Sequence, residues 1–111
     1  MWSLLVSLLA VQTSAPAADR PNAQVLAQAY DRCMATYAVR LTRTDAADAA
    51  IFAQARDSCR PLGEQMRAAL NAELPPAQAA ELLTALDARA EPDFMAMLAR
   101  IRSDRARRAA Q

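Results

Sequence analysis

Several residue types are absent or scarce in this chain of 111 residues, and each shortage excludes some chemistry. There is no histidine, the side chain that most often shuttles protons near neutral pH and a common zinc ligand. A single glycine excludes glycine-rich phosphate loops and dinucleotide-binding fingerprints. Most enzyme classes need one of these features, so we expect a protein that is not an enzyme and that holds no cofactor.

Large apolar side chains are also scarce, with only two Phe, two Tyr and one Trp. Alanine contributes 29 residues to the 54% of the chain that is hydrophobic, so most of this fraction is methyl groups. All 13 basic residues are Arg, and they are spread along a chain whose net charge is +1. The length and composition predict one small domain with a thin core.

The N-terminal segment has the pattern of a secretory signal. Residues 2–11 (WSLLVSLLAV) form an uncharged, Leu-rich run, and the sequence APA follows at 15–17. This order is typical of a signal peptide with an A-x-A cleavage site, so we expect residues 1–17 to be removed between Ala17 and Ala18. A retained anchor and a misassigned start are the alternatives, although ten apolar residues fall short of the about 20 that span a bilayer. We therefore expect a periplasmic or secreted protein.

The remaining residues, 18–111, form one domain in which helix is the only regular structure predicted, because β-branched residues are few and no run alternates. Three prolines stand where a helix can begin, since proline is tolerated in the first turn. Periodicity and proline predict helices at about 21–42 (with Asp19 as cap), 48–60, 61–74, 76–90 and from Pro92 onward. The expected inner faces are Leu26, Tyr30, Cys33, Tyr37 and Leu41; Ile51, Phe52, Ala55 and Cys59; Leu62, Met66, Leu70 and Leu74; Leu82, Leu83 and Leu86; and Phe94, Met97, Leu98 and Ile101.

The two cysteines, Cys33 and Cys59, are the most informative pair in the sequence. In an exported protein they most simply form one disulfide, which should stabilise the fold by about 3 to 4 kcal/mol. A redox centre is the weaker alternative, because the spacing is not Cys-x-x-Cys and no His is present to activate a thiol. A metal site is weaker too, since zinc usually takes four ligands. The fold class we predict is all-α: a disulfide-linked helical hairpin extended to a small bundle of about four to five helices.

The disulfide also predicts where the hairpin turns. In an antiparallel hairpin, residues equidistant from the turn face each other, and the midpoint between the cysteines is Ala46. Asp45 or Asp48 is then expected to cap the second helix. A cap at Thr42 would move the turn by about four residues, or roughly 6 Å along the axis.

Other candidate side chains have ordinary structural explanations. Thioethers can bind Cu(I), but core packing explains the methionines better; these are Met34, Met66, Met95 and Met97. The carboxylates at Asp45, Asp48, Glu81 and Asp87 fit helix caps and solvated faces. An enzyme would have to rely on side chains such as Asp48, Asp57 and Tyr37, and no nucleophile with its base is identified among them.

The C-terminal segment is basic, with five arginines against Asp104: Arg100, Arg102, Arg105, Arg107 and Arg108. Positive charge is favourable at a helix C-terminus, which is the simplest explanation. The alternative is attachment to an anionic surface, either lipid headgroups or an acidic partner, at about 1 kcal/mol per basic residue. Nucleic acid is not expected, because no aromatic residue lies among these arginines to stack on bases.

Two short segments, YDRC at 30–33 and DSCRPL at 57–62, together with the signal pattern, resemble small two-cysteine, alanine-rich exported helical proteins of proteobacteria that have no assigned function. The segment LPPAQ at 74–78 is similar to the L-T-x-x-Q motif of Spy/CpxP-like periplasmic chaperones, but lacks its Thr. A looser copy, LTRTD at 41–45, ends in Asp. The resemblance to Spy/CpxP-like proteins implies an ATP-independent chaperone, or an envelope-stress or metal sensor. Such a chaperone would hold unfolded chains on a concave helical surface.

These observations predict a bacterial, exported, non-enzymatic helical protein that acts through protein or surface contacts. Its partner is an unidentified protein, a second copy of itself or an anionic membrane surface. The chaperone is the alternative function.

Overall fold

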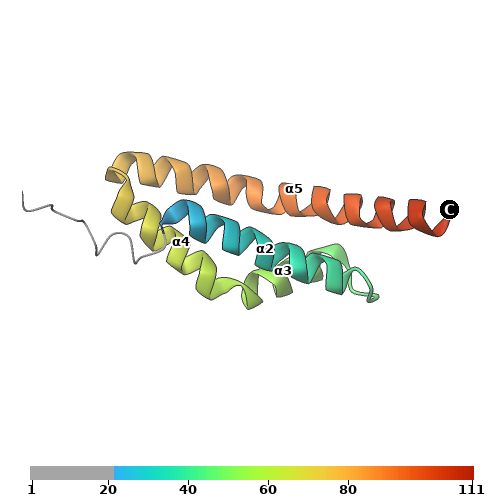
Figure 1. Cartoon of the computed structure of the whole chain (residues 1–111). Helices are drawn as coiled ribbons and strands as arrows, with labels where there is room; N and C mark the ends of the chain where they lie inside the picture. The colour runs from blue at the N-terminus through green and yellow to red at the C-terminus, as the bar shows by residue number, and fades with distance from the viewer. Residues whose placement is uncertain (1–21) are drawn as a thin grey trace, which may run out of the picture.

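The computed structural model describes residues 22–111, so the predicted signal peptide, its cleavage site at Ala17 and Ala18, and the proposed cap Asp19 lie outside the described residues. The described chain is all-α, as predicted, with four helices and no strand in this range. The helices are α2 (Ala23–Leu41), α3 (Asp48–Ser58), α4 (Arg60–Glu73) and α5 (Pro76–Ala109), and α5 runs the length of the molecule (Figure 1).

Helix α2 begins with two side-chain acceptors for its first backbone N–H groups. The Asn22 side chain accepts from the N–H of Val25 at 2.9 Å, which makes Asn22 the cap. The carboxylate of Glu73, at the end of α4, accepts from the N–H of Ala23 at 2.7 Å. A negative charge at this position also complements the helix dipole, so Glu73 ties the end of α4 to the start of α2.

Two of the predicted proline starts are confirmed. Pro61 lies in the first turn of α4, and Pro76 is the first residue of α5. Helices α3 and α4 are separated by Cys59 alone, whose N–H donates to the carbonyl of Ala55 and whose carbonyl accepts from Gly63. The chain therefore turns a corner at Cys59 without a loop.

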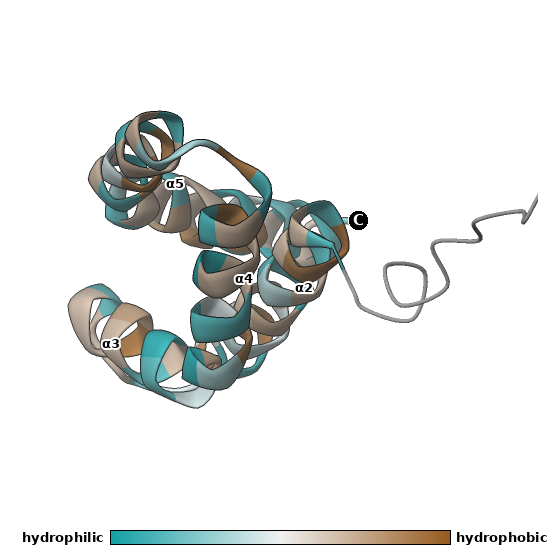
Figure 2. Ribbon diagram, turned by 90° about the vertical axis from the view of Figure 1, so that its left-hand side faces the viewer, coloured by the Kyte–Doolittle hydropathy of each residue, from teal (hydrophilic) through white to brown (hydrophobic). Residues whose placement is uncertain are grey.

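The core lies where α2, α3 and the second half of α5 meet. Its buried side chains are Met34, Ala38, Leu41, Ile51, Phe52, Ala55, Cys59, Phe94 and Leu98. The rings of Phe52 and Phe94 are 5.2 Å apart, joining α3 to α5. Each helix carries both hydrophilic and hydrophobic residues around its axis (Figure 2), so the helices are amphipathic and the core is thin, as the composition predicts.

The predicted inner face of α3 is confirmed in full, whereas that of α2 is rotated slightly. Leu26 and Leu41 are buried as expected, but Tyr30, Cys33 and Tyr37 are only half-buried. Their places at the centre of the face are taken by smaller or more flexible residues, Met34 and Ala38. The expected apolar residues Leu62, Met66 and Leu70 of α4, and Leu74 directly after it, are all half-buried.

The predicted break before Pro92 is absent, because α5 continues through this residue. The same inward stripe runs on both sides of the proline, from Ala79 and Ala90 to Phe94 and Leu98, and this packing holds the helix together. Proline removes one backbone hydrogen bond and crowds the carbonyl four residues earlier, but Pro92 lies on the exposed side of α5. The packing of α5 against the core therefore outweighs the cost of proline inside the helix.

The predicted inner face of the first half of α5 is wrong in part. Leu82 and Leu86 are 38% and 39% exposed, and only Leu83 is half-buried. The 34 residues of α5 span about 51 Å, whereas α2 spans about 28 Å, so α5 is longer than the surface available to cover it. No helix in residues 22–111 has a stretch long and apolar enough to cross a membrane.

Candidate functional site

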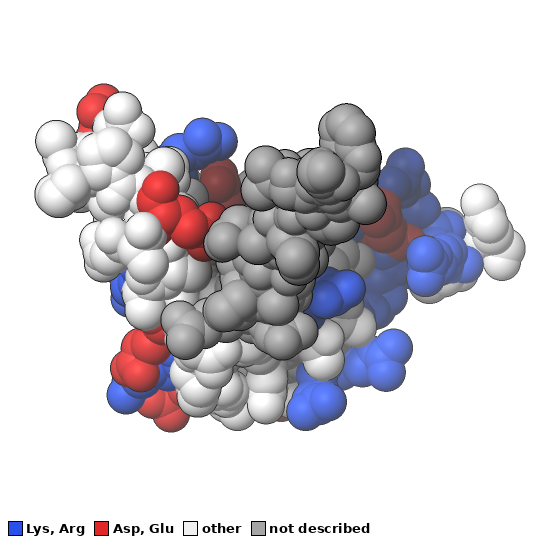
Figure 3. All heavy atoms as spheres, turned by 60° about the vertical axis from the view of Figure 1, so that its left-hand side comes forward, with Lys and Arg blue, Asp and Glu red and all other residues white. Residues whose placement is uncertain are grey.

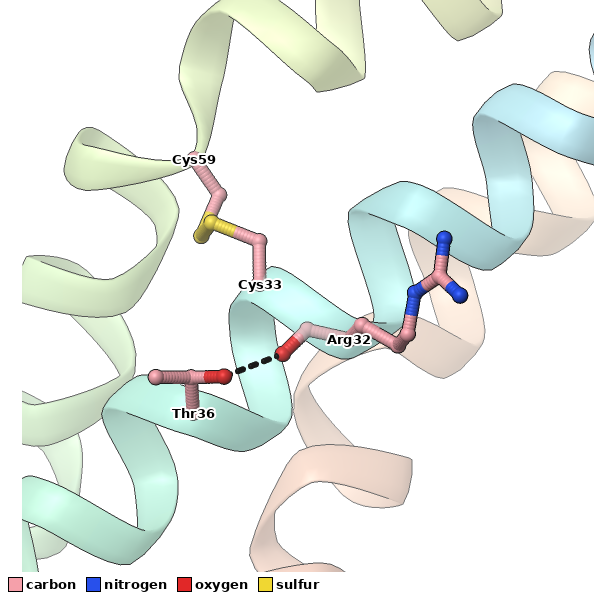
Figure 4. The surroundings of a disulfide bond; sticks show 4 residues. All are labelled: Arg32, Cys33, Thr36 and Cys59. Atoms are coloured by element: carbon pink, nitrogen blue, oxygen red, sulfur yellow. Dashed lines mark hydrogen bonds between the residues drawn. A yellow bond between two sulfur atoms is a disulfide. The ribbon is translucent and has the colours of Figure 1, made fainter.

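The predicted disulfide is present and joins the middle of α2 to the corner between α3 and α4 (Figure 4). The Cα atoms of Cys33 and Cys59 are 6.0 Å apart, and Cys59 is only 1% exposed. Beside the bond, the hydroxyl of Thr36 donates to the carbonyl of Arg32 within α2 (Figure 4). The disulfide therefore holds both α3 and α4 against α2 through a single junction.

The hairpin turn lies between residues 42 and 47 and includes Ala46, as the cysteine spacing predicts. The predicted caps are not formed, since α3 begins with Asp48 itself and has no side-chain cap. Instead the hydroxyl of Thr44 donates to the carbonyl of Leu41 and accepts from the N–H of Ala46 at 3.2 Å. The loop is closed by Thr44, a residue that the sequence analysis did not single out.

The structure gives no support to a redox or metal-binding role for the cysteines and methionines. Both cysteines are in the disulfide, and residues 22–111 contain no cluster of three His, Cys, Asp or Glu side chains that could hold a metal ion. Met34 is buried in the core, while Met95 and Met97 pack against the same core from α5. Met66 is half-buried on α4.

A groove of about 540 Å³ lies at the corner between α3 and α4 and was not anticipated. It is lined by Tyr30, Ala53, Arg56, Asp57, Arg60, Gly63, Glu64 and Arg67. Its charges are largely engaged: Arg60 pairs with Asp57 at 2.8 Å, and Arg67 pairs with Asp87 of α5. The signal in the sequence was the recurrence of Arg and Gly every three or four residues from Arg56 to Arg67, which places them on one side of consecutive helices.

The predicted basic C-terminal segment lies on the last turns of α5, and part of it is structural. Arg102 forms an ion pair with Asp48 at the start of α3. The guanidinium of Arg105 donates to the carbonyls of Thr42 and Val39, at 3.4 and 3.5 Å. These contacts hold α5 against the turn between α2 and α3.

The same contacts bring two further arginines to the C-terminal segment. Arg40 lies in the last turn of α2 with its guanidinium 5.2 Å from the ring centroid of Tyr37, and Arg43 is exposed in the turn. Together they form what we call the basic end: Arg40, Arg43, Arg100, Arg102, Arg105, Arg107 and Arg108. Arg40 and Arg43 were not expected at this surface, because they lie about 60 positions from the other arginines. The predicted turn near Ala46 is the sequence signal that points to them.

The opposite part of the molecule is acidic. In the first half of α5, Glu81, Asp87 and Glu91 outnumber Arg89, and Glu73 lies at the neighbouring end of α4. In the surface view, most of the red acidic side chains lie on the left, with some blue ones among them, whereas the right side is largely blue (Figure 3). At the other end of α5, Arg107 and Arg108 lie in the last turn, where positive charge complements the helix dipole.

The side chains considered for catalysis are not brought together. Asp48 and Asp57 lie at the two ends of α3, about 14 Å apart along its axis, and each pairs with an arginine. Tyr37 is half-buried beneath Arg40. The two segments similar to the chaperone motif both lie where helices are joined, at 74–78 between α4 and α5 and at 41–45 between α2 and α3.

Comparison with known proteins adds no assignment: no protein-family model matches the chain, and neither a curated protein nor a solved structure matches it.

Proposed function

We propose that this protein is exported to the periplasm or outside the cell, and that it acts without catalysis through contacts with a protein or surface. Its basic end binds an anionic surface. The observation that carries this proposal is the gathering of arginines from α2, the turn and α5 at one end of a molecule whose other end is acidic.

The disulfide supports the proposed compartment. Disulfides persist in the periplasm and outside the cell, where conditions are oxidising, and are rare in the bacterial cytosol. The Cys33–Cys59 bond is compatible with such a location, and the Leu-rich N-terminal segment supplies the expected export signal.

Export is tested by the intact mass, without reduction, of the protein recovered from the periplasm of a bacterial host that expresses the whole chain. We expect the mass of residues 18–111 less two hydrogens, since cleavage after Ala17 and one disulfide are both predicted. A full-length mass with free thiols would contradict export and would reopen the redox and metal roles of Cys33 and Cys59.

The basic end is tested by sedimentation with vesicles of anionic or neutral phospholipid. Arg43 and Arg108 suit the test because neither forms an ion pair within residues 22–111, so their replacement leaves the fold's contacts intact. At about 1 kcal/mol for each charge, Arg43→Glu with Arg108→Glu should weaken binding to anionic vesicles by at least about 30-fold.

The matched control is Arg32→Glu with Arg56→Glu, which changes the net charge equally but away from the basic end. We expect the control variant to retain most of the binding. Equal loss in both variants would show that net charge alone attracts the protein, and equal binding to neutral vesicles would contradict the proposal.

A further inference from the structure

A continuous exposed stripe follows one side of α5 and takes part in none of the contacts that build the core. Its residues recur every three or four positions, as one face of a helix requires. All are exposed: Leu82, Leu86, Arg89, Asp93, Ala96, Arg100, Asp104 and Arg107. We call this set the α5 stripe.

The charges of the α5 stripe are ordered so that the stripe is complementary to an identical stripe running in the opposite direction. Along the helix they run positive, negative, positive, negative, at Arg89, Asp93, Arg100 and Asp104. Arg89 and Asp104 are equally far from the point just after Ala96, and so are Asp93 and Arg100. An identical helix lying antiparallel about that point therefore sets each arginine opposite an aspartate.

We propose that the α5 stripe binds a second copy of this chain, with the two α5 helices antiparallel and crossing next to Ala96. Arg89 of each copy faces Asp104 of the other, and Asp93 of each faces Arg100. The same patch serves both copies, as a two-fold symmetric interface requires. Ala96, the smallest side chain on the stripe, lies at the crossing, where a small residue permits close approach of the helices.

The exposed Leu86 fits the same arrangement. In this register Leu86 lies opposite Arg107 of the other copy, whose aliphatic stem can cover an apolar neighbour while its charged end stays in water. A second copy would thereby reduce the exposure of the leucine that the rest of the bundle leaves uncovered.

Charge complementarity favours a second copy over an unrelated partner, because the arginines and the aspartates that would pair all lie on α5. Two ion pairs are already present along the stripe, Arg89 with Asp93 at 3.8 Å and Arg107 with Asp104, and all four side chains are at least half exposed. A carboxylate has two oxygens and can accept from a second guanidinium. Because exposed ion pairs are individually weak, we expect a weak dimer that dissociates at high salt.

The interface is tested by sedimentation equilibrium of the purified protein without residues 1–17, at low and high salt. The wild-type chain should dimerise at low salt. Asp93→Arg sets arginine against Arg100 in both halves of the dimer, and Arg100→Asp sets aspartate against Asp93. Each variant alone should dimerise at least about tenfold more weakly.

An equal mixture of the two variants provides the decisive measurement, because Arg at 93 of one chain then faces Asp at 100 of the other. We expect the mixture to recover the wild-type dimer as a heterodimer. Glu91→Arg is the matched control: it makes the same charge change on α5, about 200° around the helix from Asp93, and should leave dimerisation unchanged.

Three outcomes would overturn the proposal: a wild-type chain that is monomeric at about 1 mM and low salt, an Asp93→Arg variant that dimerises like the wild type, or a mixture that fails to recover while both variants keep wild-type helix content. The basic end and the α5 stripe share Arg100 and Arg107, so surface binding is tested separately at Arg43 and Arg108, which are not on the stripe.

Discussion

The only glycine in the chain, Gly63, lies where α4 passes the ring of Tyr30 on α2. A Cβ atom at this position would be 3.1 Å from the ring edge, closer than an ordinary van der Waals contact. Glycine inside a helix costs about 1 kcal/mol relative to alanine, so close packing of α2 against α4 is obtained at the expense of helix propensity.

Alanine at position 63 would favour the helix but crowd Tyr30, so we expect the effects of substitutions at the two positions on the unfolding free energy to be coupled. Gly63→Ala alone should give little or none of the expected gain in unfolding free energy, because Tyr30 must shift. In a Tyr30→Ala background the same change should stabilise the protein by about 0.5 to 1 kcal/mol. A double-mutant cycle by urea unfolding measures the difference, and additive effects would show that the contact carries no strain.

Asp31 on α2 makes stability depend on pH. Partial burial raises the pKa of its carboxyl above the ordinary value of 3.8. Because the folded pKa is higher than the unfolded one, the charged carboxylate destabilises the fold, and this penalty disappears as the pH falls through the folded pKa to below 3.8.

Asp31→Asn should therefore raise the unfolding free energy at pH 7, and its advantage over the wild type should vanish below pH 3.8. Thermal unfolding of both proteins across this range provides the measurement. Asp45→Asn, in the exposed turn, is the control. A variant that is less stable than the wild type at pH 7 would mean that the carboxylate makes a favourable contact.

At the scale of the helices, Pro92 is the clearest conflict between local preference and packing. It lies inside α5 on the exposed side, and its replacement removes a penalty of up to about 3 kcal/mol for proline in a helix interior. Pro92→Ala should raise the unfolding free energy by about 1 to 3 kcal/mol, or the midpoint of thermal unfolding by several degrees. A loss of stability would show that proline at this position helps to seat Phe94 in the core.

Most helix boundaries could be predicted because they depend on local chemistry. Proline in the first turn marks α4 and α5, and the cysteine pair predicts the turn before α3. The continuity of α5 and the exposure of Leu82 and Leu86 could not be predicted, since both depend on which surfaces of other helices are available to cover α5.

In the candidate site, too, the features that depend on local sequence could be predicted and those that depend on tertiary contacts could not. The arginines on α5 are visible as a local run, and the sequence places them at a helix end. That Arg102 pairs with the start of α3 and Arg105 with carbonyls at the end of α2, while Arg40 and Arg43 join the surface, depends on contacts between residues about 60 positions apart. Such pairings follow from the assembled fold and not from spacing along one helix.

For the molecule as a whole, the disulfide compensates for a core with few aromatic side chains. It closes a loop between residues 26 positions apart, for which chain entropy predicts about 3 to 4 kcal/mol of stabilisation. Cys33→Ser with Cys59→Ser should lower the unfolding free energy by about this amount, measured by urea unfolding without reductant. An unchanged midpoint would mean that the packing of α2 against α4 suffices without the bond.

The position of the same bond also determines what proteolysis can separate. Arg43 is exposed in the turn, between the two cysteines in sequence and outside any helix, where a protease such as trypsin can reach the backbone. A cut there adds one water but leaves two pieces covalently joined through Cys33 and Cys59. The nicked protein would remain one molecule until a reductant broke the disulfide. The piece that carries Arg40 and Arg43 could then separate from the piece that carries the arginines of α5.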